Sequence, residues 1–295
     1  MFVSSGSELI DICSKESIPI WEYSIRKEME KSELSREDIL VRMKKNLNTM
    51  LNSSSYAQDK EVKSVSGLIG GDACMLRKYA DRGNTLTGDF MVKAMARAMS
   101  SSEVNAAMGK IVACPTAGSC GILPAVIISA AEKLNKTEED MVNCLFTASG
   151  VGIIIAKHAT MAGAEGGCQA ECGSAAAMGS AAVVEMMGGT PEQALDAAAI
   201  VIKNILGLVC DPVAGLVEVP CAKRNIAGTV SALTTADVVM AGVKSKIPFD
   251  EVIWAMNKVG KQMAPELRET AQGGIAITPT AKKLKKEIFD KKTSL

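Results

Sequence analysis

The stretch TPEQALDAAAIVIKNIL, residues 190–206, carries the signal that decides the fold class. Thr190 and Gln193 are spaced as a capping box, and Pro191 stands at the first helical position, so a helix is expected to begin here. Apolar residues then recur on one helical face: Leu195, Ala199, Ile202 and Leu206. A start signal followed by helical periodicity predicts an amphipathic helix whose apolar face packs into a core.

Other segments carry the same kind of signal. Pro124 follows a glycine-rich turn and opens the apolar run AVIISAAEKL, as proline does at the start of a helix. Thr137 precedes three acidic residues, and Pro248 introduces another apolar stripe. The charged but periodic segment Arg26–Leu51 predicts a helix, and Ser53–Lys60 reads as a polar break after it.

No segment shows the alternation of a half-buried strand. The run Val151–Ile155 could form a buried strand, but its neighbours have helical patterns. The predicted fold is therefore mainly α, a compact bundle of many helices interrupted by Gly-rich polar loops. We expect residues 1–60 to form an N-terminal helical arm and residues 61–295 to form the main body, the two making one structural unit. The Lys-rich segment Lys282–Lys292 is expected to be a solvated terminal helix.

The composition excludes several classes of function. The 295 residues include 33 basic and 33 acidic side chains, so no net charge attracts nucleic acid or an acidic membrane surface. Aromatic residues make up only 3%, which disfavours base-stacking surfaces, and the small residues that replace them suit closely packed helices. No uncharged apolar stretch of about 18 residues is apparent, so no membrane span is expected.

The nine cysteines indicate a reducing compartment. The sequence begins without the basic and apolar regions of a secretory signal, and an odd number of cysteines suits a disulfide framework poorly. Free, catalytic or metal-bound thiols are expected instead, and the cytoplasm is the expected compartment.

Three Gly-rich polar loops interrupt the apolar helices, and each contains cysteine. They are CPTAGSCG at residues 114–121, GAEGGCQAECG at residues 163–173, and the segment from Cys210-Asp211-Pro212 to Pro220-Cys221. Glycine lets the backbone approach a ligand closely and exposes N–H donors. These loops are therefore the candidate site.

Common site motifs do not account for the cysteines. The sequence has no C-x-x-C, no P-loop and no G-x-S-x-G, and the single histidine, His158, cannot build a zinc hydrolase site. A cysteine nucleophile paired with His158 stays open as an alternative, although nothing marks either partner. Thiolates distant in sequence remain, and such thiolates can hold an iron–sulfur cluster. A catalytic cluster differs from an electron carrier by leaving one iron without a protein ligand, so that it can act as a Lewis acid.

Four segments together resemble a known family. The segments SVSGLIGGDA, CPTAGSCGILPAV, AGAEGGCQAECGSAAAM and CDPVAGLVEVPCAKRN are similar to those of iron–sulfur L-serine dehydratase α chains, in the same order, between about Ser64 and Gln272. The resemblance implies that Cys168, Cys210 and Cys221, separated by 42 and 11 positions, hold a 4Fe–4S cluster.

Other cysteines stay as rivals or as packing residues. Cys172 lies four residues from Cys168 and is the main rival as a ligand. Cys114 and Cys120 flank the PTAGS sequence, where loop shape explains them better than ligation. The remaining cysteines are expected to be buried small hydrophobes: Cys13, Cys74 and Cys144.

The resemblance also implies the reaction, the deamination of L-serine to pyruvate and ammonia by a lyase. The substrate carboxylate would meet the PTAGS loop, and the GGD turn would form a second wall. The candidate substrate-binding residues are Thr116, Ala117, Gly118, Ser119, Gly70, Gly71 and Asp72. Lys223 and Arg224 could pair with a substrate carboxylate or with acids such as Asp211 and Glu218.

The catalytic base is not identified by any motif, and His158 is its only histidine candidate. Some enzymes of the resembling family are single chains with an extra N-terminal domain, whereas others divide that content between β and α subunits. The sequence starts directly with the α portion, so we expect a β subunit to complete the site and to bring the base, in an assembly that can include several copies.

Three alternatives to this function remain. The same chemistry could act on L-threonine, since one methyl group is worth only about 1–3 kcal/mol in a pocket. A pyridoxal-phosphate dehydratase would need a Schiff-base lysine and a phosphate loop, and no convincing pair is present. A non-catalytic iron–sulfur sensor is the alternative from a different class.

Overall fold

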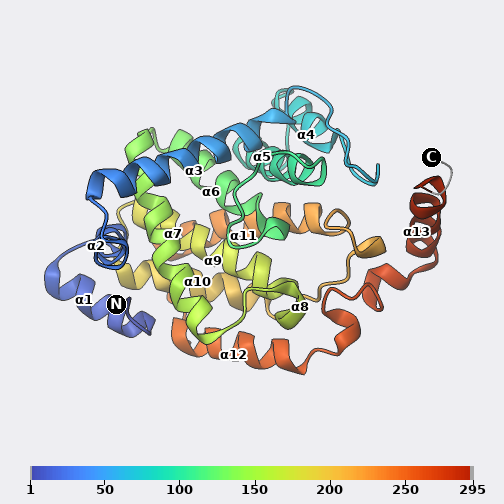
Figure 1. Ribbon diagram of the computed structural model, residues 1–295. Coiled ribbons are helices and arrows are strands. Elements are labelled where there is room, and N and C mark those ends of the chain that lie inside the picture. Colours follow the sequence, from blue (N-terminus) through green and yellow to red (C-terminus); the bar gives the residue numbers. More distant parts are fainter. Residues whose placement is uncertain (1, 293–295) are drawn as a thin grey trace.

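A computed structural model of the chain describes residues 2–292. Thirteen α-helices account for most of this part of the chain, which contains isolated β-bridges but no strand, and the mainly α prediction is confirmed (Figure 1). The helices are α1 Gly6–Glu16, α2 Ile20–Ser32, α3 Arg36–Tyr56, α4 Asp72–Ala80, α5 Asp89–Ala106, α6 Ile122–Lys133, α7 Glu138–His158, α8 Gly163–Gly166, α9 Ser174–Met186, α10 Pro191–Ile205, α11 Cys221–Met240, α12 Phe249–Gln262 and α13 Pro279–Lys292. Short 3-10 turns are η1 Ala117–Ser119, η3 Val213–Gly215, η4 Pro265–Leu267 and η5 Gly274–Ile277, and η2 Gln169–Gly173 is a π-helical turn.

Helix α9 lies at the centre of the bundle. All of its residues except Glu185 are buried, and it packs against α6, α7, α10 and α11 (Figure 1). Its sequence SAAAMGSAAVVEM is rich in small residues, which let the neighbouring backbones approach closely. A Cβ atom on Gly179 would lie only 3.2 Å from Val126 of α6. The small-residue composition therefore has the packing role that the sequence predicts.

Helix α7 corrects one expectation about membranes. It has the length and hydropathy of a membrane span, although no such stretch was expected from the sequence. Within its apolar window 61% of the residues are buried inside the protein, and the helix packs against α2 and α9. Its apolar surface is therefore covered by other helices, as in the core helix of a globular protein.

The N-terminal region contains a helix break that the sequence reading missed. The single helix predicted over Arg26–Leu51 is two helices, because Glu33 adopts a left-handed φ of 57° at the end of α2. Ser35 then caps α3 by accepting the N–H of Asp38 at 3.1 Å. Helix α3 also continues through Ser53 to Tyr56, so the polar break begins later than expected.

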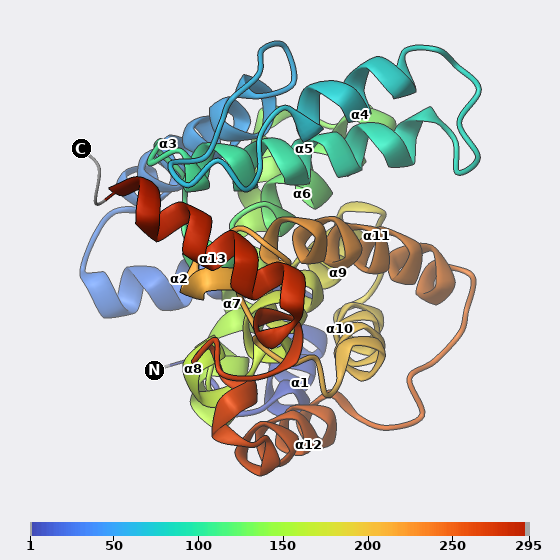
Figure 2. The same cartoon turned by 90° about the vertical axis from the view of Figure 1, so that its right-hand side faces the viewer.

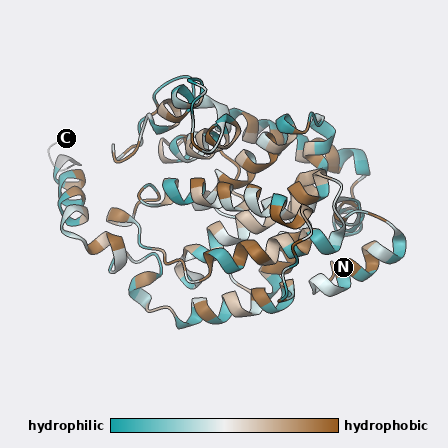
Figure 3. Ribbon diagram, turned by 180° about the vertical axis from the view of Figure 1, so that it is seen from behind, coloured by the Kyte–Doolittle hydropathy of each residue, from teal (hydrophilic) through white to brown (hydrophobic). Residues whose placement is uncertain are grey.

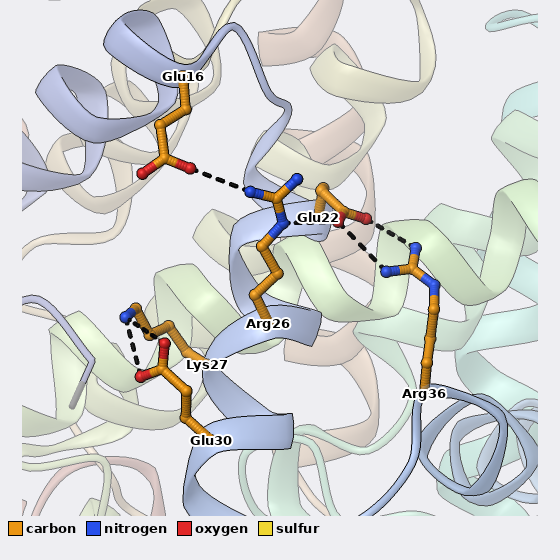
Figure 4. A network of polar contacts seen from close by, with 6 residues as sticks. All are labelled: Glu16, Glu22, Arg26, Lys27, Glu30 and Arg36. Atoms are coloured by element: carbon orange, nitrogen blue, oxygen red, sulfur yellow. Dashed lines mark hydrogen bonds and ion pairs between the residues drawn. The ribbon is translucent and has the colours of Figure 1, made fainter.

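Ion pairs connect these N-terminal helices (Figure 4). Glu22 of α2 accepts Arg26 at 2.7 Å and Arg36 of α3 at 2.7 Å, and Arg26 also contacts Glu16 of α1 at 3.0 Å. Lys27 and Glu30 pair along α2. Exposed pairs of this kind each contribute little to stability, so the attachment rests mainly on buried apolar residues: Leu9, Ile20, Ile25 and Leu47, which share one core with α7 and α9.

Helix α13 lies at the opposite end of the molecule from α1 (Figures 1 and 2). Hydrophilic residues dominate it, in contrast to the helices at the centre (Figure 3). It is nevertheless not fully solvated, because Ala281 and Ile288 are buried and the helix packs against η3 and η5. This contact places α13 beside the loop that contains Cys210.

A first prediction concerns Gly121, which precedes α6. Its φ of −84° suits any residue, but a Cβ atom there would lie 2.3 Å from the backbone oxygen of Ala98 in α5. We expect Gly121→Ala to destabilise the protein by about 1–3 kcal/mol through overpacking, measured by urea unfolding. Gly173→Ala is the control, since a Cβ at this helical position meets its nearest atom at 3.8 Å. Equal stability of the two variants would contradict the packing described.

Candidate functional site

The three cysteines implied as cluster ligands come from three separate elements. Cys168 directly precedes the π-helical turn η2, Cys210 lies in the loop between α10 and η3, and Cys221 is the first residue of α11. All three side chains are buried, with exposed fractions of 2%, 3% and 7%. The fold thus takes thiols from distant parts of the sequence out of water.

The thiols lie close enough to influence one another's ionisation. Burial, and then the negative charge of Cys168, raise the pKa of Cys221 to about 12. The same two causes raise the pKa of Cys210. Cys168 behaves in the opposite way: its sulfur shares a hydrogen bond of 3.4 Å with the sulfur of Cys172, and this bond lowers the pKa of Cys168. The charge of Cys168 thus acts on both Cys210 and Cys221, and Cys172 lies directly beside it.

Arg224 provides the positive charge beside these thiols. It lies one turn into α11, donates from Nη2 to Oδ1 of Asp211 at 2.7 Å, and donates from Nη1 to the carbonyl oxygen of Val209 at 2.7 Å. Its charge also lowers the pKa of Cys168, after the effect of Cys172. The guanidinium thus connects the Cys210 loop to α11 and favours thiolate at Cys168.

The C-terminal segment fixes the backbone around Cys210. The Cys210 N–H donates to the carbonyl of Leu267 at 2.8 Å, and its carbonyl accepts the N–H of Glu269 at 2.7 Å. Oδ2 of Asp211 accepts the N–H of Ile275 at 2.7 Å. Cys210 is therefore held from both sides, by α11 and by the segment that leads to α13.

The PTAGS loop docks onto the same helix α11. Asn225, one turn beyond Cys221, donates to the carbonyl of Gly118 at 2.7 Å and accepts the N–H of Gly121 at 2.9 Å. It also donates to the carbonyl of Cys221 at 3.0 Å. Asn225 was not singled out from the sequence, although its place in the segment CAKRN beside a cysteine was a usable signal. It fixes the position of the loop relative to Cys221.

Glu171 is a second residue that the sequence reading missed. It lies in η2, between Cys168 and Cys172, and its Oε1 accepts the hydroxyl of Thr116 at 2.7 Å. Burial raises the pKa of its carboxyl group. Its position between two cysteines in a Gly-rich loop, and in a π-helical turn of the kind often found at functional sites, could have marked it.

The GGD turn is connected to α11 through Lys223. Gly70 needs to be glycine, because it has a φ of 156° and a Cβ there would lie 2.6 Å from the carbonyl oxygen of Val62. The carboxylate of Asp72 pairs with Lys223 of α11 at 2.5 Å. The backbone N–H of Asp72 donates to Oε1 of buried Glu103 at 2.6 Å. Lys223 therefore pairs with Asp72, and Arg224 with Asp211.

The loop residues Thr116 and Ser119 hold each other, with their side-chain oxygens 3.2 Å apart. Ala117 and Gly118 use their carbonyls to bind Asn105 and Asn225. His158 lies elsewhere: it is exposed at the end of α7, its ring contacts the carbonyl of Ser4, and its own carbonyl accepts from Asn257 at 2.9 Å. Within residues 2–292, His158 forms no hydrogen bond with the three cysteine loops.

The other cysteines form ordinary buried contacts. The thiol of Cys114 donates to the carbonyl of Cys120 at 3.8 Å, that of Cys120 to Ser101 at 3.7 Å, and that of Cys144 to Ala182 at 3.4 Å. Cys13 and Cys74 are also buried. These contacts are those of packing residues.

The donor set suits a cluster better than a single ion. Among the residues that the structure describes, no three His, Cys, Asp or Glu side chains converge closely enough to bind one metal ion. A four-iron cluster is larger than one ion, and its thiolate ligands stand further apart. Three buried thiols that share one electrostatic environment, with a guanidinium beside them, fit such a group in chemistry and in number.

A second prediction concerns Asp211. Asp211→Asn keeps the shape of the side chain but leaves the half-buried Arg224 without its counter-charge, so we expect a loss of about 3–5 kcal/mol in the free energy of unfolding of the cluster-free protein. Asp81→Asn, which removes an exposed partner of Arg77, should cost less than about 1 kcal/mol. Similar losses in the free energy of unfolding for both variants would show that the Asp211–Arg224 pair stabilises the protein no more than an exposed pair does.

Comparisons with known proteins agree with this site. The sequence model of the family described as serine dehydratase alpha chain matches residues 15–276. The chain is 51% identical to a probable L-serine dehydratase, alpha chain, of Bacillus subtilis (strain 168), over 96% of this chain and 94% of that protein. It is 47% identical to the L-serine dehydratase, alpha chain, of Peptoniphilus asaccharolyticus, over 97% of this chain and 98% of that protein.

L-serine dehydratase 1 of Escherichia coli (strain K12) is a longer relative. It is 41% identical over 182 residues, which cover 61% of this chain but only 40% of that protein. The resemblance seen in the four sequence motifs is confirmed by these matches. The chain belongs to the serine dehydratase alpha chain family.

Proposed function

We propose that this chain is the catalytic subunit of an L-serine ammonia-lyase that converts L-serine to pyruvate and ammonia, with a 4Fe–4S cluster on Cys168, Cys210 and Cys221. The observation that carries the proposal is the burial of three thiols from three loops, close enough that the charge of Cys168 acts on both Cys210 and Cys221, with Arg224 beside Cys168. The names of the Bacillus subtilis and Peptoniphilus asaccharolyticus relatives support the reaction, and the family is generally iron–sulfur dependent.

The choice of Cys168 over Cys172 has electrostatic support. The charge of Cys168 acts on both Cys210 and Cys221, and Cys172 lies beside Cys168 with a sulfur–sulfur hydrogen bond of 3.4 Å. A thiol hydrogen-bonded to a ligand sulfur can support that ligand without binding the metal itself. Cys172 is therefore assigned a supporting role.

A bound cluster with one iron free of protein ligands would supply Lewis acidity toward the substrate hydroxyl. The protein residues have to orient the substrate and exclude water. The PTAGS loop, in which the side-chain oxygens of Thr116 and Ser119 lie 3.2 Å apart and Asn225 binds the carbonyl of Gly118, would offer backbone donors to the substrate carboxylate. The GGD turn, paired with α11 through Lys223, is assigned the second wall. Removal of the α proton and departure of the β hydroxide, together one water molecule, yield aminoacrylate, which tautomerises to an imine and takes up water to give pyruvate and ammonia.

A β subunit is proposed to complete the site. The ring of His158, the sole histidine of the sequence, contacts the carbonyl of Ser4 and forms no hydrogen bond with the cysteine loops within residues 2–292, so we assign the base to another chain. The relatives named alpha chain imply a partner, and the greater length of the Escherichia coli relative leaves room for the same content within one chain. L-Serine, the β subunit and the cluster are thus the three components of the proposed enzyme, and the reducing interior of a cell is its proposed location.

The cysteine assignment predicts a graded result. Cys168→Ser, Cys210→Ser and Cys221→Ser, reconstituted without oxygen, should each lose most of their bound iron and sulfide and at least about 100-fold in turnover. Cys172→Ser should retain the cluster, and the buried packing thiol Cys144 provides the control variant Cys144→Ser. Iron and sulfide analysis with pyruvate formation measures both. Retention of a full cluster by Cys168→Ser together with its loss from Cys172→Ser would reverse the assignment.

The β-subunit assignment predicts a dependence on mixing. The reconstituted chain alone should form pyruvate from L-serine at least about 100-fold more slowly than the same chain mixed with purified β subunit, because general-base catalysis contributes about 10²–10⁴-fold. His158→Gln should leave the activity of the mixture unchanged. Equal turnover with and without β would refute the assignment, and loss of activity in His158→Gln would return the role of base to this chain.

A further inference from the structure

The carboxylate of Glu171 lies beside the cysteines without a cationic partner. Asp211 pairs with Arg224, and Asp72 with Lys223. Glu171 forms no ion pair within residues 2–292, and its hydrogen bond comes from the neutral hydroxyl of Thr116. A cationic group of a ligand would therefore supply the counter-charge that the described side chains do not give to Glu171.

Two glycines let the backbone pack closely against this carboxylate. A Cβ atom on Gly163 would lie 2.6 Å from Oε2 of Glu171 and 3.2 Å from the sulfur of Cys210, so these two atoms lie on the same side of Gly163. A Cβ atom on Gly118, in the PTAGS loop, would lie 3.2 Å from Oε1. The carboxylate of Glu171 therefore lies between the PTAGS loop and the loop of Cys210, with Oε2 beside Cys210.

The environment adds negative charge to this space. The charge of Glu269, from the segment that holds Cys210, acts on both Glu171 and Cys210. Arg224, the nearest arginine on α11, uses its donors on Asp211 and on the carbonyl of Val209. A ligand that enters beside Cys210 and Glu171 would therefore be favoured if it carried a positive charge.

L-Serine carries one such group, its α-ammonium, within two bonds of the hydroxyl-bearing carbon. We propose that Glu171 binds the α-ammonium group of L-serine, while the Thr116 hydroxyl that donates to Oε1 keeps Oε2 directed toward Cys210. This assignment rests on the proposed function and deepens it, because it makes Glu171 the residue that distinguishes an amino acid from a hydroxy acid of the same length.

The test compares two ligands that differ only in the amino group. Glu171→Gln keeps the size of the side chain and its acceptor for Thr116 but removes the charge. With the cluster-loaded chain and its β subunit, we expect the KM for L-serine to rise about 10–100-fold, as for the loss of a charged hydrogen bond. The inhibition constant of 3-hydroxypropionate, which is L-serine without its amine, should stay within about twofold. Iron and sulfide content should match the wild type.

Glu165→Gln is the matched control, since Glu165 is an exposed glutamate of the same loop. It should change neither constant. If turnover of Glu171→Gln is too slow to measure, equilibrium dialysis of L-serine and 3-hydroxypropionate gives the same comparison.

Other outcomes overturn the assignment in recognisable ways. An equal weakening of both ligands would make Glu171 a residue that shapes the pocket, and a fall in kcat with unchanged KM would make it a proton-transfer group. Loss of iron would make it a support for the cluster. A wild-type mixture without serine turnover would refute the proposed function, whereas an active wild type with an unaltered variant would refute only the role of Glu171.

Discussion

The ion pair between Arg224 and Asp211 is the interaction on which the rest of the site depends. It connects the first turn of α11, which begins at Cys221, to the residue that follows Cys210. The second oxygen of Asp211 binds the segment around Ile275, so one carboxylate joins three elements. Because the pair is almost fully buried, it is strong only while both partners remain in place. The same guanidinium also lowers the pKa of Cys168. Arg224 therefore both connects the loops and favours the thiolate form of Cys168.

The helices were readable from the sequence because their start signals are local. Thr190 caps α10 and Thr137 caps α7 through side-chain hydrogen bonds with the residues expected. The break at Glu33 was missed because a residue other than glycine with a positive φ does not change the spacing of apolar residues. The N-cap at Ser35 was missed because it lies within a charged segment that has no other helix-start signal. The apolar length of α7 was undervalued because its few polar residues interrupt the run without ending the helix.

The site was predictable only in part. Cys168, Cys210 and Cys221 were predicted as ligands because they stand in motifs that resemble those of a family. Such a resemblance can point to residues that are far apart in the sequence. Neither Asn225 nor Glu171 could be assigned a role in this way, because each acts on a loop more than fifty positions away and its importance appears only when the loops meet. By sequence, Lys223 could pair with a substrate carboxylate or with acids such as Asp211 and Glu218. The structure pairs it with Asp72 instead, through the packing of α4 against α5 and of α5 against α11.

The backbone of Cys210 is hydrogen-bonded to Leu267 and Glu269, and the side chain of Asp211 to Ile275, and these bonds have a consequence for biosynthesis. Cys168 is translated about a hundred codons before the residues that bind the backbone of Cys210. The Cys210 loop therefore reaches its final arrangement only after residues 267–275 have been synthesised and have packed against it, so the order of translation separates the making of these thiols from their positioning.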